Sequence, residues 1–466
     1  MACRPTTSLW YPHVSLCAYS DVFARVFSTL SFQFVDRVEE PGHMPEQFPG
    51  IEKSLNFFRT MHDSRLIPLR CMPKRIIQAD RIFSGTGETW EGEKNRAIVI
   101  DETGVILDLI PVGSAEAEVF EGSICPGFVN AHGHLELAHL KGAIGRHTTL
   151  IPFLDGVNKL RAFPEEEKQA AIARAEVQMW QAGVSACGDI SNSLDSLAVK
   201  RASSIRFHTF IEIFGVSDAR TRAAIERAEP IQQAYREAGL SAGLSPHAPY
   251  SARTLLLREL SARARAGSYP ISIHMQETQA EQKLFTEADP SFPDFFKSMG
   301  IDDTEEVPVG PNPLDYVMAS VSGSEVCQLM LVHNTLTTSA DMHTALNSQG
   351  VDPWWCLCPR ANLYIENQLP DFSLFQKYSD RVLVGTDSLA SNDDLNPLNE
   401  LIAIREAAPT IDPGLLISWA CGNGACFFGW DDLGQIEKGR KPGLVLISRS
   451  EGGSPLGPGS LSRRLA

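Results

Sequence analysis

The chain has 466 residues, of which 43% are hydrophobic and 21% are charged, and its formal net charge is −16. This composition is typical of a globular protein with enough apolar material for a large core, and it excludes a mainly disordered chain. The excess of acidic residues opposes binding to nucleic acid or to an anionic membrane surface, so a small molecule is the expected partner.

The cysteines and the hydropathy pattern indicate the compartment. The ten cysteines are spread along the chain and show neither a dense disulfide framework nor a paired zinc-binding spacing. No apolar run approaches the roughly 20 residues that a membrane-spanning helix needs, and the first residues lack the basic segment and apolar core of a secretion signal. We therefore expect a soluble, cytoplasmic protein.

Residues 1–72 show no sustained helical or strand periodicity, and the sequence assigns them no role. The first predicted strand is Arg75–Phe83, which is followed by the turn residues Ser-Gly-Thr-Gly and by a second apolar run at Ala97–Ile100. Met72 could be the natural first residue, in which case the preceding segment is an appendage, an error of gene prediction or a targeting peptide.

From Ile124 onwards, short apolar strands alternate with amphipathic helical stretches such as Glu165–Ala182 and Arg222–Ala238. This alternation is the pattern of βα units, and eight such units predict a closed barrel rather than an open sheet. The eight strands are predicted to end near His134, Ser191, Gly215, His247, His274, His333, Pro359 and Asp387.

After the last helix, the run Gly434–Ile447 returns to glycine-rich turns and apolar strand. We therefore predict an α/β protein with a TIM-like (β/α)8 barrel over residues 124–433. Residues 73–123 and 434–466, from the two ends of the chain, are predicted to form a small flanking β-sandwich. Residues 1–72 remain an unassigned N-terminal extension, and Gly452–Ser460 is expected to be a surface loop.

The sharpest chemical signal is the run Pro-Gly-Phe-Val-Asn-Ala-His-Gly-His at residues 126–134. Residues two apart in a strand point the same way, so His132 and His134 can present both imidazoles to one ion. An isolated His-x-His pair is weak evidence, and unrelated core or helix-capping histidines are the alternative. The carboxyl ends of barrel strands converge on one face, however, and further candidates end later strands, namely His247, His274, His333 and Asp387.

This pattern resembles the amidohydrolase superfamily, and within it the cytosine-deaminase-like branch that includes S-adenosylhomocysteine, guanine and aminofutalosine deaminases and the triazine hydrolases. The resemblance runs from about Lys74 to the C-terminus. It implies that one divalent metal ion is bound by His132, His134, His274 and Asp387. These ligands suit both Zn²⁺ and Fe²⁺, with Zn²⁺ the first candidate. Relatives with two ions use a carboxylated lysine at the end of the fourth strand, where this sequence has a histidine.

The resemblance also implies the chemistry. A divalent ion lowers the pKa of bound water from 15.7 to about 7, which supplies hydroxide at neutral pH. Asp387 would take a proton from that water, and Glu277 would protonate the ring nitrogen and pass a proton to the departing amine. His333 would orient the hydroxide and stabilise the oxyanion, and His247 would form a hydrogen bond with the substrate.

Two acidic residues have a structural alternative. Glu277 is close to Gln279 and Glu281, a pattern that is also typical of a solvated helix start where an acid favours the helix dipole. Glu136 lies in the loop where relatives place a substrate contact, and it could equally be a structural salt-bridge partner.

Other polar residues near the strand ends have supporting or structural roles. Asp189 is expected to support the site through hydrogen bonds behind the ligands. Cys356 and Cys358 lie on an apolar strand and are predicted to be core residues. The segment 360–363 follows that strand and is a possible substrate contact. No role is assigned to the remaining histidines of the region, His139, His147, His208 and His343.

We therefore predict a metal-dependent hydrolase that deaminates an aminated purine nucleoside derivative or a related N-heterocycle. The run from His132 to Gly142 most resembles aminofutalosine-deaminase-like and chlorohydrolase-like proteins, which implies an adenosine-derived substrate. One alternative is a chlorohydrolase or cyclic-amide hydrolase of the same superfamily. The other is an inactive barrel that acts as a scaffold, although no ligand of the implied set is missing. The resemblance further implies a homo-oligomer, either a dimer or larger.

Overall fold

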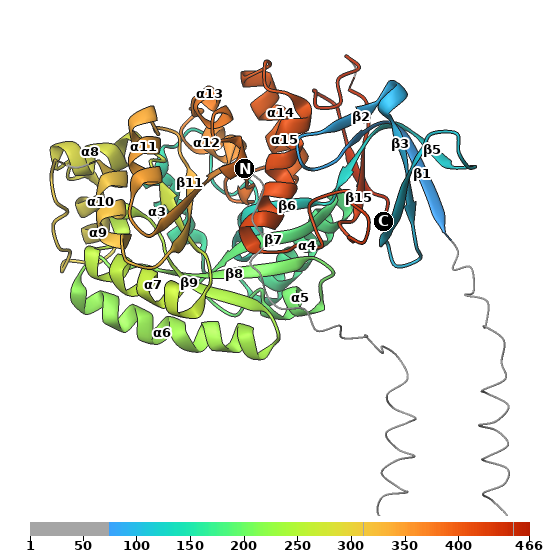
Figure 1. The fold of residues 1–466 in the computed structure, drawn as a ribbon. Coiled ribbons are helices and arrows are strands. Elements are labelled where there is room, and N and C mark those ends of the chain that lie inside the picture. Colours follow the sequence, from blue (N-terminus) through green and yellow to red (C-terminus); the bar gives the residue numbers. More distant parts are fainter. Residues whose placement is uncertain (1–73, 311, 451) are drawn as a thin grey trace, which may run out of the picture. The chain divides into compact units, whose positions relative to one another are not determined.

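The computed structural model describes residues 74–310, 312–450 and 452–466, so the predictions for residues 1–72 lie outside it. In this part of the chain, parallel strands surrounded by helices lie beside a mixed sheet built from both of its ends (Figure 1). No helix among the described residues is long and apolar enough to cross a membrane.

The mixed sheet has seven strands in the order β16-β15-β5-β1-β3-β4, with β2 paired to β1. Its strands are β1 (Arg75–Phe83), β2 (Thr89–Glu91), β3 (Arg96–Ile100), β4 (Ile106–Pro111), β5 (Glu118–Pro126), β15 (Leu444–Ile447) and β16 (Ser462–Arg464). The first predicted strand is confirmed with its bounds, and β3 confirms the second. These strands form one sheet, so the two layers expected of a β-sandwich are not confirmed.

The remaining strands form two parallel sheets, with the orders β14-β6-β7-β8-β9 and β10-β11-β12-β13. The strands are β6 (Phe128–His134), β7 (Val184–Ser191), β8 (Arg206–Ile213), β9 (Ser241–Pro246), β10 (Ile271–Met275), β11 (Cys327–His333), β12 (Val351–Leu357), β13 (Val382–Val384) and β14 (Asp387–Ser388). Three of them end at the predicted residues, His134, Ser191 and His333. The two short strands β13 and β14 together occupy the place of the eighth predicted strand.

Backbone hydrogen bonds join the two parallel sheets at both edges. On one side, the N–H of His274 donates to the carbonyl of His247 at 2.9 Å. On the other side, the N–H of Gly385 donates to Leu357 at 3.0 Å and that of Thr386 donates to His132 at 2.9 Å. The strands therefore have a TIM-like arrangement, in which their carboxyl ends face one common region.

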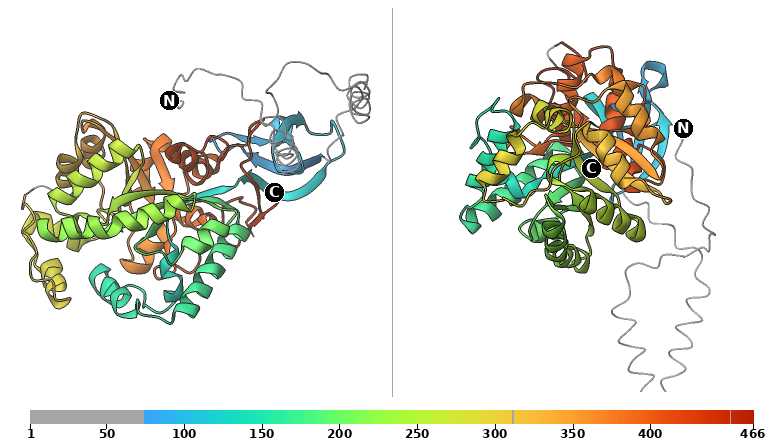
Figure 2. Two further views of the ribbon diagram at one scale, coloured as in Figure 1. Left: turned by 90° about the horizontal axis from the view of Figure 1, so that it is seen from below. Right: turned by 90° about the vertical axis from the view of Figure 1, so that its left-hand side faces the viewer.

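Helices lie outside the central strands (Figure 2). They are α3 (Leu150–Leu160), α4 (Glu165–Ala182), α5 (Leu197–Ala202), α6 (Asp218–Glu237), α7 (Thr254–Gly267), α8 (Gln279–Glu287), α9 (Ser291–Ser298), α10 (Pro313–Val321), α11 (Ser339–Asn347), α12 (Pro359–Ile365), α13 (Phe372–Gln376), α14 (Pro397–Ala407), α15 (Pro413–Ala420) and α16 (Gly422–Phe428). A short 3-10 helix, η2 (Leu135–Leu140), directly follows β6. The helix predicted at 165–182 is confirmed, whereas α6 begins before its predicted start because Ser217 caps it and accepts a hydrogen bond from the N–H of Arg220.

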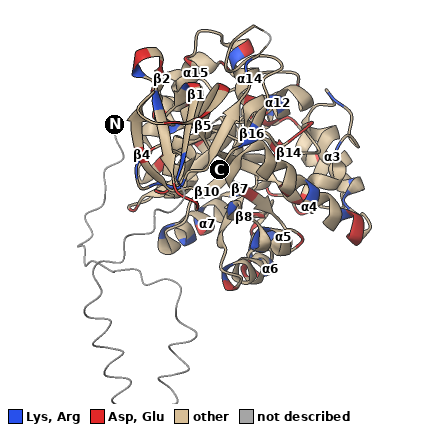
Figure 3. Ribbon diagram, turned by 90° about the vertical axis from the view of Figure 1, so that its right-hand side faces the viewer, with Lys and Arg blue, Asp and Glu red and all other residues tan. Residues whose placement is uncertain are grey.

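Alternating side chains of the central strands pack into two separate clusters. On β11, Leu329 and Leu331 belong to the large core cluster, whereas Met330 and Val332 belong to a smaller cluster. Cys356 and Cys358 are fully buried in the smaller cluster, which confirms that they are core residues. Charged residues of both signs are interspersed along the outer helices (Figure 3).

Gly183 joins the barrel helix α4 to strand β7 and lies against the mixed sheet. Its φ is +103°, and its N–H caps the helix by donating to the carbonyls of Met179 and Trp180. A Cβ at this position would lie 2.3 Å from a methyl group of Val445 in β15. A side chain here would therefore meet both backbone strain and a steric clash.

We expect Gly183→Ala to lower the free energy of unfolding by about 2–4 kcal/mol, because strain and overlap act together. Gly239→Ala is the matched control, since Gly239 has a φ of +81° and a Cβ there would have no other described atom within 4 Å. This control should cost only about 1 kcal/mol. Urea unfolding followed by circular dichroism measures both, and equal losses would contradict the contact between α4 and the mixed sheet.

Candidate active site

The carboxyl ends of the central strands bring the predicted histidines into one cluster. The Nε2 atoms of His132 and His134 lie 3.0 Å apart. The ring centroids of His132 and His274 are separated by 5.0 Å, and those of His274 and His333 by 5.4 Å. These rings are excluded from bulk solvent apart from small parts of His134 and His274. Side chains from β6, β10 and β11 thus share one polar region.

Asp387 completes this cluster from β14. Its Oδ1 lies 3.3 Å from Nε2 of His134 and 3.8 Å from Nε2 of His132. Its Oδ2 accepts a hydrogen bond of 2.5 Å from the hydroxyl of Ser391. The backbone of Asp387 has a φ of +56°, and that of His333 has a φ of +76°. Such conformations are costly for residues other than glycine and concentrate at functional sites.

The donor atoms fit a metal ion. His132, His134 and Asp387 each offer one ligand atom within 4.8 Å of the others, and so do His132, His274 and His333. The Nδ1 of His274 lies 2.8 Å from the carbonyl oxygen of His247, which can only accept, so Nδ1 carries the proton and Nε2 keeps a free lone pair. Three imidazoles and one carboxylate are a set that suits Zn²⁺ or Fe²⁺.

Burial gives these residues the protonation states that bind a cation. It lowers the pKa of His132 and of His134, and it lowers that of His274 to about 3, with neighbouring imidazoles contributing. Burial acts to raise the pKa of Asp387, but His134 and His333 outweigh it and leave that pKa lowered. These shifts favour neutral imidazoles and an ionised carboxylate, which are the forms that coordinate metals.

Glu277 follows β10 and faces the same region. Its Oε1 lies 3.6 Å from Nε2 of His333, and its side chain is nearly fully buried. Burial raises the pKa of Glu277 well above its usual range, and the nearby carboxylate of Asp387 adds to this, so Glu277 can hold a proton at neutral pH. Glu281 is buried too and accepts a hydrogen bond from the N–H of Glu277. The alternative of a solvated helix start is therefore wrong.

His333 and His247 are each oriented by one neighbour. Nδ1 of His333 lies 2.8 Å from Oδ1 of Asn362, and Nδ1 of His247 lies 2.7 Å from the hydroxyl of Ser251. Asn362 belongs to the segment 360–363, which the sequence offered as a substrate contact. No residue of that segment is among those that line the cavity described below, and Asn362 contacts His333, so the substrate contact stays a prediction.

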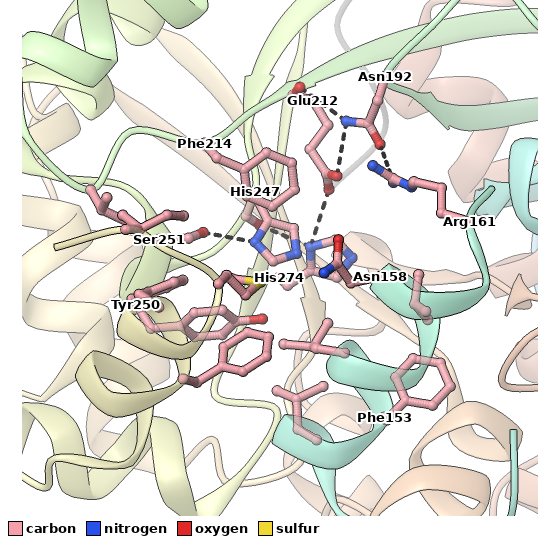
Figure 4. Close-up of a pocket in the computed structure, with 18 of the residues that line it drawn as sticks. Phe153, Asn158, Arg161, Asn192, Glu212, Phe214, His247, Tyr250, Ser251 and His274 are labelled. Atoms are coloured by element: carbon pink, nitrogen blue, oxygen red, sulfur yellow. Dashed lines mark hydrogen bonds and ion pairs between the residues drawn. The ribbon is translucent and has the colours of Figure 1, made fainter. Parts of the chain in front are cut away.

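A cavity of about 550 Å³ opens in front of the cluster. Its lining includes the six predicted residues His134, His247, His274, Glu277, His333 and Asp387. Helices α3 and α9 contribute apolar side chains, among them Phe153 and Phe296. Figure 4 shows His247 and His274 side by side, with Phe214 next to the His247 ring at a centroid distance of 4.4 Å. The site thus combines a polar floor with a largely apolar wall.

The polar residues of this wall that were not found from the sequence include Arg161, Asn192 and Glu212 (Figure 4). Arg161 donates to Oδ1 of Asn192 at 3.1 Å, and Nδ2 of Asn192 lies 3.3 Å from Oε2 of Glu212. Oε1 of Glu212 lies 3.7 Å from Nδ1 of His274, and burial raises the pKa of Glu212 to about 7. The signal in the sequence that could have identified Glu212 is an acidic residue inside an apolar strand, Phe-Ile-Glu-Ile-Phe at residues 210–214.

Glu136 is not part of the cavity lining. Its Oε2 accepts a hydrogen bond of 2.9 Å from the N–H of Asn192, and its Oε1 accepts one of 2.9 Å from the hydroxyl of Ser193. Neither the substrate contact nor the salt bridge expected from the sequence is supported by this geometry. Glu136 instead fixes the loop after β7, from which Asn192 reaches the cavity.

Comparison with known proteins agrees with this arrangement. A model of the amidohydrolase family matches residues 123–456, which is more than half of the chain. The chain belongs to the amidohydrolase family.

Individual members of the amidohydrolase family resemble the chain at low sequence identity. It is 25% identical to the 5'-deoxyadenosine deaminase of Methanococcus maripaludis over 396 residues, which cover 80% of this chain and 85% of that protein. The aminofutalosine deaminase of Helicobacter pylori, solved in complex with methylthio-coformycin, has a TM-score of 0.68 and 21% identity over 81% of this chain and 93% of that one. The zinc-complexed atrazine chlorohydrolase of Arthrobacter aurescens has a TM-score of 0.60 and 16% identity over 79% and 86%. These structural likenesses establish the TIM-like fold.

We expect His134→Asn to weaken zinc binding by the amidohydrolase at least about tenfold, because one of the converging imidazoles is lost. His139→Asn is the matched control, since His139 lies on η2 outside this cavity and should leave the zinc content unchanged. Elemental analysis after zinc loading and desalting measures both variants. Equal zinc in H134N and in the unaltered protein would contradict the role of His134.

Proposed function

We propose that this amidohydrolase is an aminohydrolase that removes the exocyclic amine of an adenosine-derived nucleoside and releases ammonia. The observation that carries this proposal is the buried Glu277, whose pKa is raised by its burial, beside His333 at the floor of a cavity that also holds the histidine and aspartate cluster. The names of similar proteins support it, since they include deaminases of 5'-deoxyadenosine, of aminodeoxyfutalosine and of methylthioadenosine or S-adenosylhomocysteine.

The proposed ligands of one divalent ion are His132, His134, His274 and Asp387. Zn²⁺ is favoured over Fe²⁺, and this choice is supported by the zinc reported in solved neighbours such as an adenosine deaminase of Xanthomonas campestris. When bound, the ion lowers the pKa of a water molecule to about 7 and so makes it a nucleophile. The hydrogen bond from His274 to the carbonyl of His247 orients the His274 ring for binding this ion.

Two carboxyl groups move the protons. Asp387 accepts a proton from the attacking water as the new C–O bond forms. Glu277 donates its proton to the ring nitrogen beside the attacked carbon, and it then carries the proton of the new C–OH group to the amine, so that the C–N bond breaks and ammonia leaves. The proton held by Asp387 then restores that of Glu277. The products are the oxo-purine nucleoside and ammonia, which balances the one water consumed.

Two histidines and the cavity wall position the substrate. His333, oriented by Asn362, stabilises the negative charge that develops on oxygen during attack. His247, oriented by Ser251, forms a hydrogen bond with the heterocycle. The cavity volume of about 550 Å³ lies within the range of small-molecule sites and leaves room for a group attached to the purine. Glu212 offers a further polar contact on the wall.

We also propose the finer architecture that the sequence predicted. The hydrogen bonds at both junctions of the parallel sheets support a closed (β/α)8 barrel over residues 124–433. The strands of the mixed sheet support a second domain made of residues 73–123 and 434–466. A cytoplasmic location and a homo-oligomer stay predictions.

The function is tested by loading the full chain with zinc and measuring ammonia release from adenosine, methylthioadenosine, S-adenosylhomocysteine, aminofutalosine, guanine and cytosine. We expect release from at least one adenosine derivative and faster turnover of it than of either free base. Chloride release from a chlorotriazine, without any ammonia from this panel, would replace deamination by the chlorohydrolase alternative.

We expect Glu277→Gln to lower kcat for the best substrate by about 10²–10⁴-fold, because the amide keeps the shape of the side chain but cannot transfer a proton. KM and zinc content should stay close to those of the unaltered protein. Glu287→Gln, at the exposed end of α8, is the matched control and should not change kcat. A kcat of E277Q within a factor of two of that of the unaltered protein would remove Glu277 from the mechanism.

A further inference from the structure

A fully buried lysine lies behind the site. The side chain of Lys200, on α5, has no exposed surface, and its Nζ is 2.6 Å from Oδ2 of Asp189. The same ammonium donates to the hydroxyls of Ser191 at 3.0 Å and Thr209 at 3.1 Å. It also lies 5.0 Å from the centroid of the Tyr235 ring. One ion pair and two hydrogen bonds therefore hold the positive charge of Lys200 in a fixed place.

Asp189 links this charge to the metal-binding end of β6. Its other oxygen, Oδ1, accepts a hydrogen bond of 2.9 Å from the N–H of Leu135, the residue directly after His134. Asp189 also pairs with Gly133 in the register of β6 and β7, and a Cβ on Gly133 would lie 3.5 Å from Oδ1. The carboxylate thus lies against the backbone that carries both imidazoles of the His-x-His pair. This is the supporting hydrogen bond that the sequence predicted for Asp189.

The bond to Leu135 falls where the chain changes direction. Helix η2 begins at Leu135, and the preceding His134 has φ −135° and ψ 78° and provides no side-chain cap. The Asp189 carboxylate accepts from the first N–H of η2 and thereby takes the place of that cap. The direction of the His134 side chain is consequently coupled to the position of a carboxylate on another strand.

We propose that Asp189 is a positioning residue for the metal site: Lys200 neutralises its buried charge, and its contact with the N–H of Leu135 aims His134 at the ion. The inference rests on the proposed metal ligands, although not on the identity of the substrate. Stability alone does not account for the pair, because replacing a buried ion pair by apolar residues of similar size is often neutral or stabilising. A defined hydrogen bond to the backbone, by contrast, requires a carboxylate that is fixed in place.

Two double variants of the full chain separate positioning from stability. Lys200→Met combined with Asp189→Asn removes both charges but keeps a side-chain oxygen for the N–H of Leu135. Lys200→Met combined with Asp189→Leu removes the charges and the acceptor together. Zinc dissociation constants are measured by competition with a chromogenic chelator. We expect the Asn variant to bind zinc within about threefold of the unaltered protein, and the Leu variant to bind about 10–100-fold more weakly.

Lys168→Met is the control, since Lys168 forms ion pairs with Glu165 and Asp195 on the outside of the barrel and its loss should not change zinc affinity. Equal zinc affinities of the two double variants would overturn the positioning role. If the Leu variant does not fold by circular dichroism, Lys200→Met combined with Asp189→Ala takes its place with the same expected contrast. A difference in zinc affinity together with an inactive substrate panel would leave this inference standing and reject only the proposed function.

Discussion

The close approach of ring nitrogens and a carboxylate oxygen at the carboxyl ends of the strands is the constraint on which the rest of the site depends. His132 and His134 point their Nε2 atoms at each other across 3.0 Å, and Oδ1 of Asp387 lies 3.3 Å from the second of them. Burying polar atoms this close together is costly, and burial also lowers the pKa of both imidazoles and so disfavours their positively charged forms. A divalent cation relieves this conflict, because it satisfies the nitrogen and oxygen atoms at once.

The surroundings of the cluster serve to hold these side chains in place. Asn362 and Ser251 fix the rings of His333 and His247, and Ser391 binds the carboxylate of Asp387. The buried pair of Lys200 and Asp189 extends this support to the backbone of the His-x-His run. Hydrogen bonds of this kind set which ring nitrogen carries the proton and where each side chain points, so the protein itself holds the cluster in place.

The sequence was most informative where a local pattern determines the outcome. The alternation of Arg75–Phe83 and the helical stretch Glu165–Ala182 were predicted with their bounds, and the strand-end histidines and Asp387 meet as expected because parallel strands share one face. The sequence was least informative where the direction of a side chain decides whether the residue reaches the cavity. Glu136 lies close to the site in sequence yet contacts a loop, whereas Glu212 reaches the cavity from the middle of an apolar run. Spacing along the chain cannot distinguish these two cases.

The most direct test of a shared cation is X-ray diffraction from crystals of the zinc-loaded protein, recorded on both sides of the zinc absorption edge. One anomalous peak per chain is expected, within about 2.0–2.2 Å of a nitrogen of His132, His134 and His274 and of an oxygen of Asp387. A peak bound to other residues, or no peak among these four in a zinc-loaded crystal, would contradict the metal site and the mechanism built on it.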